Sequence, residues 1–389
     1  MNKKIVISVN TAWNICNFRA GLVRALASHG YDVMVMARKD AYAPLLASLG
    51  CRFKLLTMDA NGTSPGRDLA LLVKYHRVLQ SVRPLAYLGY TIKPNVYGSI
   101  AANGLAIPVI NNIAGLGTGF LHGAVLSGVV KRLYRYSLRH SSRVFFQNAE
   151  DRKLFVDAGL AREHVADLLP GSGIDLQHFR PMLPAPAPGP ARDFCFLLVG
   201  RMLKDKGVEE YAAAAGMVRQ LVPGVRFQLL GGVDPSNPDA IPLARIREWE
   251  RRGLLEYLES TDDVRPRLAA ADCIVLPSYR EGVPHTLLEA AAMARPIIAT
   301  DVPGCRDVVD HDANGFLCRV KSATDLARKM IEMLRLSPER RAAMGALGRS
   351  KVTAQFDERI VIAKYLAAIE QIEIAARQRS GVVLVSAGA

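Results

Sequence analysis

The sequence predicts an α/β protein of two domains, each built on a doubly wound parallel sheet. With 389 residues, the chain exceeds the size at which a single core keeps growing, so two domains are expected. Half of the residues are apolar and 22% are charged, which is typical of a globular protein with a large core. Short apolar runs alternate with amphipathic stretches along the chain, and this alternation indicates repeated βαβ units.

The first domain is predicted over residues 1–180. Its apolar runs are KIVISV, DVMVMA, RFKLLTM, LAYLGY, VINNI and RVFFQN. A helix from about Phe18 to His29 separates the first two runs, with Asn17 suited to cap its start and Gly30 to end it. Because strands alternate with helices, we expect a parallel sheet with helices on both faces.

The second half repeats this alternation after a break. Residues 181–191 are rich in proline, which cannot join the interior of a sheet, so they are predicted to link the domains. The second domain is predicted over residues 192–356, with FCFLLVG, VRFQLLGG, CIVLPS and PIIAT as strands. A helix is expected over residues 357–378, and residues 379–389 are expected to form a short tail.

Several classes of protein are excluded. The start MNKKIVISVNTAWN runs directly into a strand pattern, unlike a signal peptide, and no segment has the roughly 18 apolar residues needed to span a bilayer. The six cysteines are scattered and show no CxxC pairing, so we expect reduced thiols and no metal site. A cytoplasmic protein without a resident cofactor is therefore predicted.

The net charge of +14 is unevenly distributed. Residues 1–180 contain 22 Lys and Arg against 10 Asp and Glu, a net charge of +12, whereas the remainder carries +2. A basic half predicts an anionic partner, either nucleic acid or a membrane surface. A general bias toward solubility would give the same imbalance.

Residues 124–143 concentrate this charge in a predicted amphipathic helix. One side is apolar, with Val125, Val129, Val130, Leu133 and Tyr136, and the other side carries Lys131, Arg132, Arg135 and Arg139. A basic amphipathic helix fits docking on anionic lipid. It equally fits an ordinary helix that packs its valines on the sheet.

Two loops carry the candidate chemistry. The strand FCFLLVG leads into Arg201 and Lys206, and paired cations at the carboxyl end of a strand suit a diphosphate, although an ordinary basic turn would look the same. The strand CIVLPS leads into a glycine-bearing turn with Glu281 before it and Glu289 beyond it. Carboxylates there suit sugar hydroxyls, and a solvated helix start would also accommodate them.

Together these segments resemble the retaining GT-B glycosyltransferases of family 4, particularly the branch for capsule, O-antigen and lipid-linked oligosaccharides. The resemblance spans nearly the whole chain and includes VFFQNAEDRKLF (144–155), LLPGSGIDLQHF (168–179), LLVGRMLKDKG (197–207) and the run from DDVRPRLAAADCIVLPSYREGVPHTLLEAAA to ATDVPGCRDVV. Glu281 and Glu289 match the family's E-x7-E motif. The resemblance implies two Rossmann-like domains facing across a cleft, with the helix over residues 357–378 crossing back to the N-terminal domain.

The same resemblance implies an acceptor-binding first domain and a donor-binding second domain. Arg201 and Lys206 would hold the donor diphosphate, and Glu289 the nucleotide ribose. Glu281 would hold the donor sugar, which makes Glu281, Arg201 and Lys206 the candidate catalytic residues. Further donor contacts are implied for Gly282, Val283, Pro284, His285, Thr286, Tyr257, Leu258, Asn17, Arg19, Gly171 and Gly173.

The implied reaction is a retaining, metal-independent transfer from a nucleotide-diphosphate sugar, expected to be a UDP-N-acetylhexosamine, to an undecaprenyl-diphosphate-linked saccharide. The enzyme would act peripherally on the cytoplasmic face of the inner membrane. One alternative is a GT-B enzyme of another class, such as a sugar-nucleotide epimerase, which would need catalytic histidines in contexts that we do not find. The other is a nucleic-acid-binding protein, but the basic helix offers only Tyr134 and Tyr136 for stacking, so no nucleic-acid partner is expected.

Overall fold

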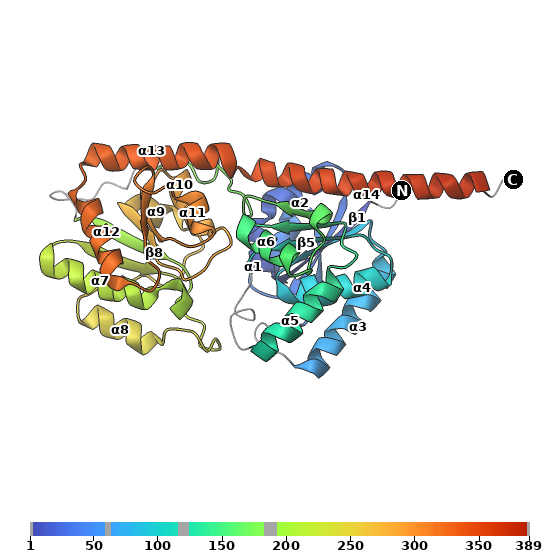
Figure 1. Cartoon of the computed structure of the whole chain (residues 1–389), viewed down its shortest axis with the longest axis horizontal. Helices are drawn as coiled ribbons and strands as arrows, with labels where there is room; N and C mark the ends of the chain where they lie inside the picture. Colours follow the sequence, from blue (N-terminus) through green and yellow to red (C-terminus); the bar gives the residue numbers. More distant parts are fainter. Residues whose placement is uncertain (1–2, 59–63, 116–123, 183–192, 387–389) are drawn as a thin grey trace. The chain divides into compact units, whose positions relative to one another are not determined.

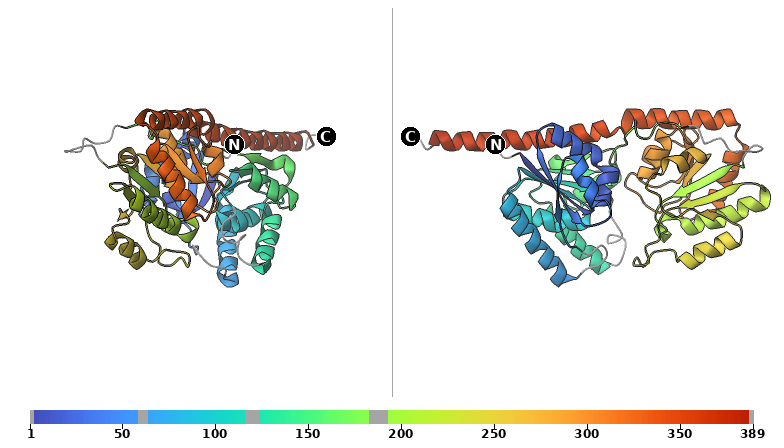
Figure 2. Two further views of the ribbon diagram at one scale, coloured as in Figure 1. Left: turned by 60° about the vertical axis from the view of Figure 1, so that its left-hand side comes forward. Right: turned by 180° about the vertical axis from the view of Figure 1, so that it is seen from behind.

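The computed structural model describes residues 3–58, 64–115, 124–182 and 193–386. Contacts divide the chain into two units, Met1–Gly173 with Glu358–Ala389, and Ile174–Asp357. Each unit has a parallel sheet with helices on both faces, as Figure 1 and the further views in Figure 2 show.

The described part of the first unit holds a seven-stranded sheet in the order β3-β2-β1-β4-β5-β6-β7, with parallel neighbours throughout. Ile5 and Ile7 belong to one core cluster and Val6 to another, because alternate residues of a strand face opposite sides of the sheet. Both faces are therefore buried, as predicted. The strands are β1 (Lys4–Thr11), β2 (Asp32–Arg38), β3 (Arg52–Leu55), β4 (Ala86–Tyr90), β5 (Val109–Ile113), β6 (Arg143–Phe146) and β7 (Ala166–Leu168).

The helix predicted from Phe18 to His29 corresponds to α2, and an additional helix, α1, precedes it. The two meet at Arg19, whose φ of −141° lies outside the helical region. Asn17 lies inside the first of them and donates from Nδ2 to the Trp13 carbonyl oxygen at 2.9 Å, so the predicted N-cap role is wrong. The α-helices of this unit are α1 (Ala12–Phe18), α2 (Ala20–Ser28), α3 (Pro65–Val82), α4 (Ser99–Gly104), α5 (Ala124–Ser137), α6 (Ala149–Asp157) and α14 (Glu358–Ser386).

The second unit repeats the architecture with a six-stranded parallel sheet, within the described residues, in the order β10-β9-β8-β11-β12-β13. Phe196 and Leu198 enter one core cluster and Leu197 the opposite one. Its strands are β8 (Cys195–Val199), β9 (Arg226–Leu230), β10 (Glu256–Tyr257), β11 (Cys273–Leu276), β12 (Ile297–Thr300) and β13 (Gly315–Cys318). Its α-helices are α7 (Val208–Leu221), α8 (Leu243–Arg251), α9 (Arg265–Ala270), α10 (His285–Ala292), α11 (Cys305–Val308), α12 (Ala323–Arg335) and α13 (Pro338–Gln355).

The division between the units falls earlier than the predicted boundary at residue 180. Ile174 donates its backbone N–H to the Phe356 carbonyl oxygen at 2.8 Å, and Phe179 packs in the core of the second unit. The chain therefore passes between units at Gly173 and Ile174. Most of the predicted linker, residues 181–191, lies outside the described residues.

Two helices end elsewhere than predicted. α5 ends at Ser137, so Arg139 follows the helix and Arg143 begins β6; Ser141 and Ser142, whose hydroxyls compete with helical hydrogen bonds, favour this earlier end. α14 continues to Ser386, so most of the predicted tail over residues 379–389 is helical. A single helical glycine costs only about 1 kcal/mol and need not end a helix.

α14 belongs to the first unit, where it packs along α2 (Figure 1). Within the described ranges, no helix combines the length and the apolar character needed to span a membrane. All six cysteines are free thiols, as expected, and five of them are buried.

Candidate functional site

The main candidate site lies in the second unit, at the carboxyl edge of its sheet, where doubly wound folds bind ligands. Arg201 is exposed in the turn after β8, and Lys206 ends a 3-10 turn (Lys204–Lys206) that leads into α7. Glu281 lies in the loop between β11 and α10, and Glu289 lies within α10.

Lys206 and Glu281 form a partly buried ion pair. Lys206 Nζ lies 2.5 Å from Glu281 Oε1, and the two side chains are 19% and 12% exposed. An ammonium group has three N–H donors, so this contact holds Lys206 in place and leaves donors for an anion. Arg201 forms no ion pair with any residue that the structure describes.

Two glycines hold the loops around this pair in close contact. Gly207 and Gly304 have φ values of +69° and +76°, a region that glycine adopts without strain. A Cβ at Gly207 would overlap the Pro277 carbonyl oxygen, and one at Gly304 would overlap the Gly282 carbonyl oxygen. The Glu281–Gly282 turn is thus fixed by the backbone at Gly304, a contact that the sequence pattern did not reveal.

Glu289 contacts a second predicted residue. Its Oε1 lies 2.8 Å from His285 Nδ1, and each side chain is 14% exposed. The sequence prediction used only the backbone of His285, although the i, i+4 spacing could have revealed this pair. A carboxylate accepts several hydrogen bonds, so Glu289 can bind His285 and a ligand hydroxyl together.

Tyr279 extends the site with contacts that sequence reasoning missed. Its hydroxyl donates to Glu210 Oε1 at 2.7 Å, and the Lys321 ammonium lies 4.8 Å from the ring centroid. Burial raises the pKa of Tyr279, as does the bond to Glu210, so the hydroxyl stays protonated and keeps donating. Through Tyr279, the loop that carries Glu281 is thereby held to α7.

Several buried polar atoms near these loops are left unsatisfied. Asp205 Oδ1, Glu210 Oε2 and Ser278 Oγ have no hydrogen-bond partner within the described part of the chain. Such atoms are uncommon in native proteins, and oxygens of this kind can accept hydrogen bonds from sugar hydroxyls. Burial raises the pKa of the nearby Cys305 thiol; the Glu281 carboxylate raises it further and Lys206 opposes this, so the thiol is neutral.

Tyr257 and Leu258, predicted to contact the base, lie at the end of β10. The Tyr257 hydroxyl donates to the Gly231 carbonyl oxygen at 2.7 Å, and the Arg247 guanidinium lies 5.4 Å from its ring centroid. Leu258 packs partly buried against a core cluster. The remaining predicted loop residues, Gly282, Val283 and Pro284, are buried, whereas Thr286 is partly exposed.

The candidate donor residues of the first unit have different environments. Asn17 is exposed, whereas Arg19 is 8% exposed, lies 4.1 Å from the Tyr90 ring centroid and donates to Asn14 Oδ1. Arg19 and Gly171 line one small cavity together with Tyr90. Burial lowers the pKa of Arg19. Gly173 has a φ of +74° and lies against the backbone of Glu358.

The basic surface of α5 differs in part from the prediction. Lys131, Arg132, Arg135 and Arg139 are exposed, as a docking surface requires. Arg135 also donates to the carbonyl oxygens of Ala158 and Gly159, at 2.9 and 3.2 Å, just beyond the end of α6.

The predicted apolar side of α5 is wrong in two places. Val129 and Tyr136 are 49% and 62% exposed, whereas Tyr134 and Leu138 pack in the core. The helix is thus rotated relative to the prediction, because the large Tyr134 ring fills the core beside Phe155. The exposed face combines cations with a valine and a tyrosine.

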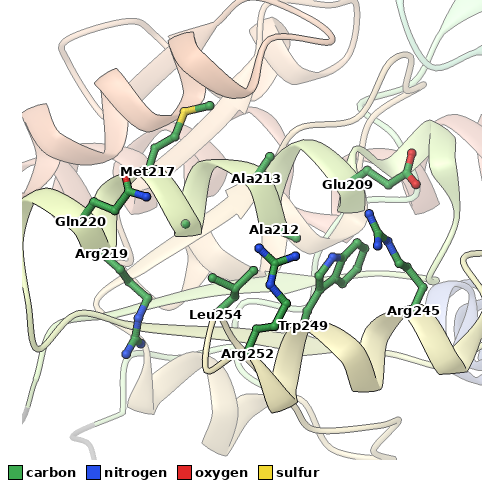
Figure 3. A pocket seen from close by; sticks show the side chains of 11 residues that line it. Glu209, Ala212, Ala213, Met217, Arg219, Gln220, Arg245, Trp249, Arg252 and Leu254 are labelled. Carbon is green, nitrogen blue, oxygen red and sulfur yellow. The ribbon is translucent and has the colours of Figure 1, made fainter.

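A separate cavity of about 750 Å³ opens between α7 and α8 (Figure 3). Arg245 and Arg252 line it, and both pair with Glu248, at 2.9 and 3.7 Å. Arg219 donates to the Val225 carbonyl oxygen at 3.3 Å. None of the predicted donor residues lines this cavity, and its arginines already have partners.

Comparisons with known proteins agree with this architecture. Residues 18–171 match the family described as "Glycosyl transferase 4-like domain", and residues 193–335 match "Glycosyl transferases group 1". Together the two matches cover more than half of the chain. HepE from Anabaena, solved in complex with UDP-glucose, has a TM-score of 0.76 at 18% identity, covering 96% of this chain and 99% of that one.

Two curated relatives also match. The N,N'-diacetylbacillosaminyl-diphospho-undecaprenol alpha-1,3-N-acetylgalactosaminyltransferase of Campylobacter jejuni is 26% identical over 380 residues, 92% of this chain and 96% of the relative. The UDP-Gal:alpha-D-GlcNAc-diphosphoundecaprenol alpha-1,3-galactosyltransferase of Escherichia coli is 24% identical over 276 residues, 69% of this chain and 70% of the relative. With two parallel-sheet α/β units and both domain families matched in order, the chain belongs to the GT-B glycosyltransferases of family 4.

Proposed function

We propose that this glycosyltransferase moves a sugar from a nucleotide-diphosphate sugar, a UDP-N-acetylhexosamine, to an undecaprenyl-diphosphate-linked saccharide, with retention of the anomeric configuration. The main support is the full-length similarity to the Campylobacter jejuni enzyme, whose name specifies an undecaprenol diphosphate acceptor and N-acetylgalactosamine transfer. The cation and carboxylate loops of the second unit supply groups suited to such a donor.

In this proposal Arg201 and Lys206 bind the donor diphosphate and stabilise the charge that develops as it leaves. Glu281 orients Lys206 through their 2.5 Å contact and faces the donor sugar. Glu289, steadied by His285 at 2.8 Å, binds the ribose. Tyr257 and Leu258 flank the base, and Asn17, Arg19, Gly171 and Gly173 contribute from the first unit.

The direct test incubates the protein with a panel of UDP- and GDP-sugars and with polyprenyl-diphosphate-linked saccharides, and scores products by mass. We expect one UDP-N-acetylhexosamine to give a product one residue heavier. NMR of the new anomeric proton should report the same configuration as in the donor. Transfer from GDP-sugars alone would contradict the proposed donor.

Activity should persist in excess EDTA, because the proposal gives the neutralisation of the leaving diphosphate to Arg201 and Lys206 rather than to a metal. Initial rates with and without EDTA provide the measurement. Loss of activity in EDTA, restored by magnesium or manganese, would show that the leaving group is stabilised in another way.

Glu289→Ala should raise the KM for the donor by about 10-fold or more, the scale expected for one charge-assisted hydrogen bond. Turnover at saturating donor should largely recover, because contacts to the ribose exist both before and during reaction. His285→Ala serves as a comparison, since it removes the imidazole that contacts Glu289 and leaves the carboxylate itself in place. A large loss of turnover with unchanged KM would contradict a ribose-binding role.

We also propose that the enzyme docks on the cytoplasmic face of the inner membrane through α5. Its exposed cations lie among Val129 and Tyr136, and a cationic face with apolar and aromatic groups suits the lipid interface. The net charge of +12 over residues 1–180 would add long-range attraction to anionic lipid.

Lys131→Gln with Arg132→Gln should weaken binding to anionic vesicles by about 30-fold, given about 1 kcal/mol for each cation near the surface. Arg135 is left intact because it holds the end of α6. Vesicle sedimentation measures the binding, and activity on a short water-soluble acceptor should be retained. Wild-type protein that ignores anionic vesicles at low salt would rule out this docking.

A further inference from the structure

A second basic cavity, of about 460 Å³, lies in the first unit. It is placed at the carboxyl ends of β2 and β3 and is covered by the first turns of α3, the edge where doubly wound sheets bind ligands. Five cations from three parts of the chain line it, namely Arg38, Lys39, Arg67, Lys74 and Lys93. Asp68 is the only carboxylate lining it in the part of the chain that the structure describes.

One of these cations, Lys93, is mostly buried and paired. Lys93 Nζ lies 2.8 Å from Asp68 Oδ1, and these side chains are 16% and 11% exposed. The Tyr97 hydroxyl donates to the other Asp68 oxygen at 2.9 Å. Asp68 is thereby satisfied from two sides. Since Asp68 already pairs with Lys93, the Arg38, Lys39 and Lys74 cations remain to give the described lining of the cavity a positive charge.

Two other lining cations, Arg38 and Lys74, are also held by hydrogen bonds. Arg38 Nε donates to the Asn10 carbonyl oxygen at 3.4 Å, and Lys74 Nζ donates to Thr57 Oγ1 at 2.6 Å. Both bonds fix a cationic group without removing its charge. Lys39 and Lys74 are exposed. Several fixed cations around one cavity suit a ligand with more than one negative charge, such as a diphosphate.

Apolar side chains also line the cavity. Leu55 lines it and is 53% exposed. The buried side chains of Leu56 and Met58 line it as well. A ligand held here by its anionic group would therefore have apolar surface beside it.

We propose that this cavity binds the diphosphate of a polyprenyl-diphosphate-linked acceptor, with the exposed Leu55 side chain contacting the first isoprene unit. This inference rests on the proposed function and identifies where the first unit recognises the lipid-linked substrate. Two surfaces of the first unit then have different roles: the α5 cations bind the anionic membrane, and the cavity binds the diphosphate of the acceptor.

The test titrates farnesyl diphosphate into the full chain, with UDP at saturating concentration to fill the donor site. Lys39→Gln with Lys74→Gln should weaken binding by about 10-fold or more, as expected when charge-assisted contacts are removed. Both side chains are exposed, so the fold should tolerate the changes. The matched control, Arg24→Gln with Lys153→Gln, removes the same charge from elsewhere on the first unit and should change the affinity by less than about 2-fold, since screened charges far from the cavity contribute little.

Two simpler probes show whether the diphosphate, the isoprene chain or both contribute to the affinity. Inorganic pyrophosphate and farnesol should each bind about 10-fold or more weakly than farnesyl diphosphate, because each lacks one of the two kinds of contact. Pyrophosphate that binds as tightly as farnesyl diphosphate would overturn the assignment to a lipid. If the cavity variant and the control variant lose the same affinity for farnesyl diphosphate, then the effect comes from overall charge and the cavity assignment is wrong. No binding of farnesyl diphosphate by the wild type would overturn the proposal outright.

A transfer assay separates this inference from the proposed function. The cavity variant should raise the KM for a diphosphate-linked acceptor and leave unchanged the KM for the same saccharide as an uncharged alkyl glycoside. Equal effects on both acceptors would contradict the cavity assignment. Wild-type protein that binds farnesyl diphosphate but transfers no sugar to either acceptor would refute the proposed function alone.

Discussion

Lys206→Ala should lower turnover at saturating substrates by about 100-fold or more, the scale seen when one preorganised charge-stabilising donor is removed. The ammonium is held 2.5 Å from Glu281 Oε1 in a partly buried setting, so it needs little rearrangement when charge develops on the leaving diphosphate. The affinity for UDP should fall less, because Arg201 remains. Steady-state turnover and calorimetric UDP binding measure the two effects separately.

Lys204→Ala is the matched control, since Lys204 is an exposed cation in the same short turn, and it should leave turnover nearly unchanged. Removing Lys206 also leaves Glu281 partly buried without its partner, which costs stability, so thermal melts must accompany the kinetics. Glu281→Gln tests the partner directly and should also lower turnover. A Lys206→Ala enzyme that is folded and fully active would contradict the role given to Lys206.

The sheet architecture could be predicted because its determinants are local. Runs such as KIVISV and FCFLLVG are apolar at nearly every position, as strands buried on both faces are, and both became central strands, β1 and β8. The two loops at the carboxyl edge followed from the same reasoning. The ion pair between Lys206 and Glu281 joins residues from these two loops, so both members could be predicted from their loops, whereas their direct contact could not.

Other features depend on tertiary contacts that periodicity does not encode. The break between α1 and α2 occurs at Arg19, whose guanidinium packs on the Tyr90 ring, a residue far along the chain. The unit boundary depends on Ile174 pairing with the segment before α14. The basic cavity of the first unit draws its cations from three separate connections, so no single stretch of sequence is conspicuous.

The tight contact at Gly304 leads to a second large expected effect. Gly304→Ala should lower the melting temperature by about 10 °C, because it combines about 1–2 kcal/mol of left-handed backbone strain with about 1–3 kcal/mol of overpacking, at about 2–4 °C for each kcal/mol. Its Cβ would overlap the Gly282 carbonyl oxygen, and relieving the overlap displaces the turn that carries Glu281. The KM for the donor should therefore rise together with the loss of stability.

Gly253→Ala isolates the steric part of this effect. Gly253 has a similar φ of +66°, but a Cβ there would meet nothing within 4 Å, so this variant adds the backbone strain alone. It should lower the melting temperature by only about 3–6 °C and leave the donor KM unchanged, because strain far from the turn does not move Glu281. If both variants lose the same stability and Gly304→Ala keeps the wild-type donor KM, then the contact between Gly304 and Gly282 does not position the turn, and Glu281 must be held by Lys206 alone.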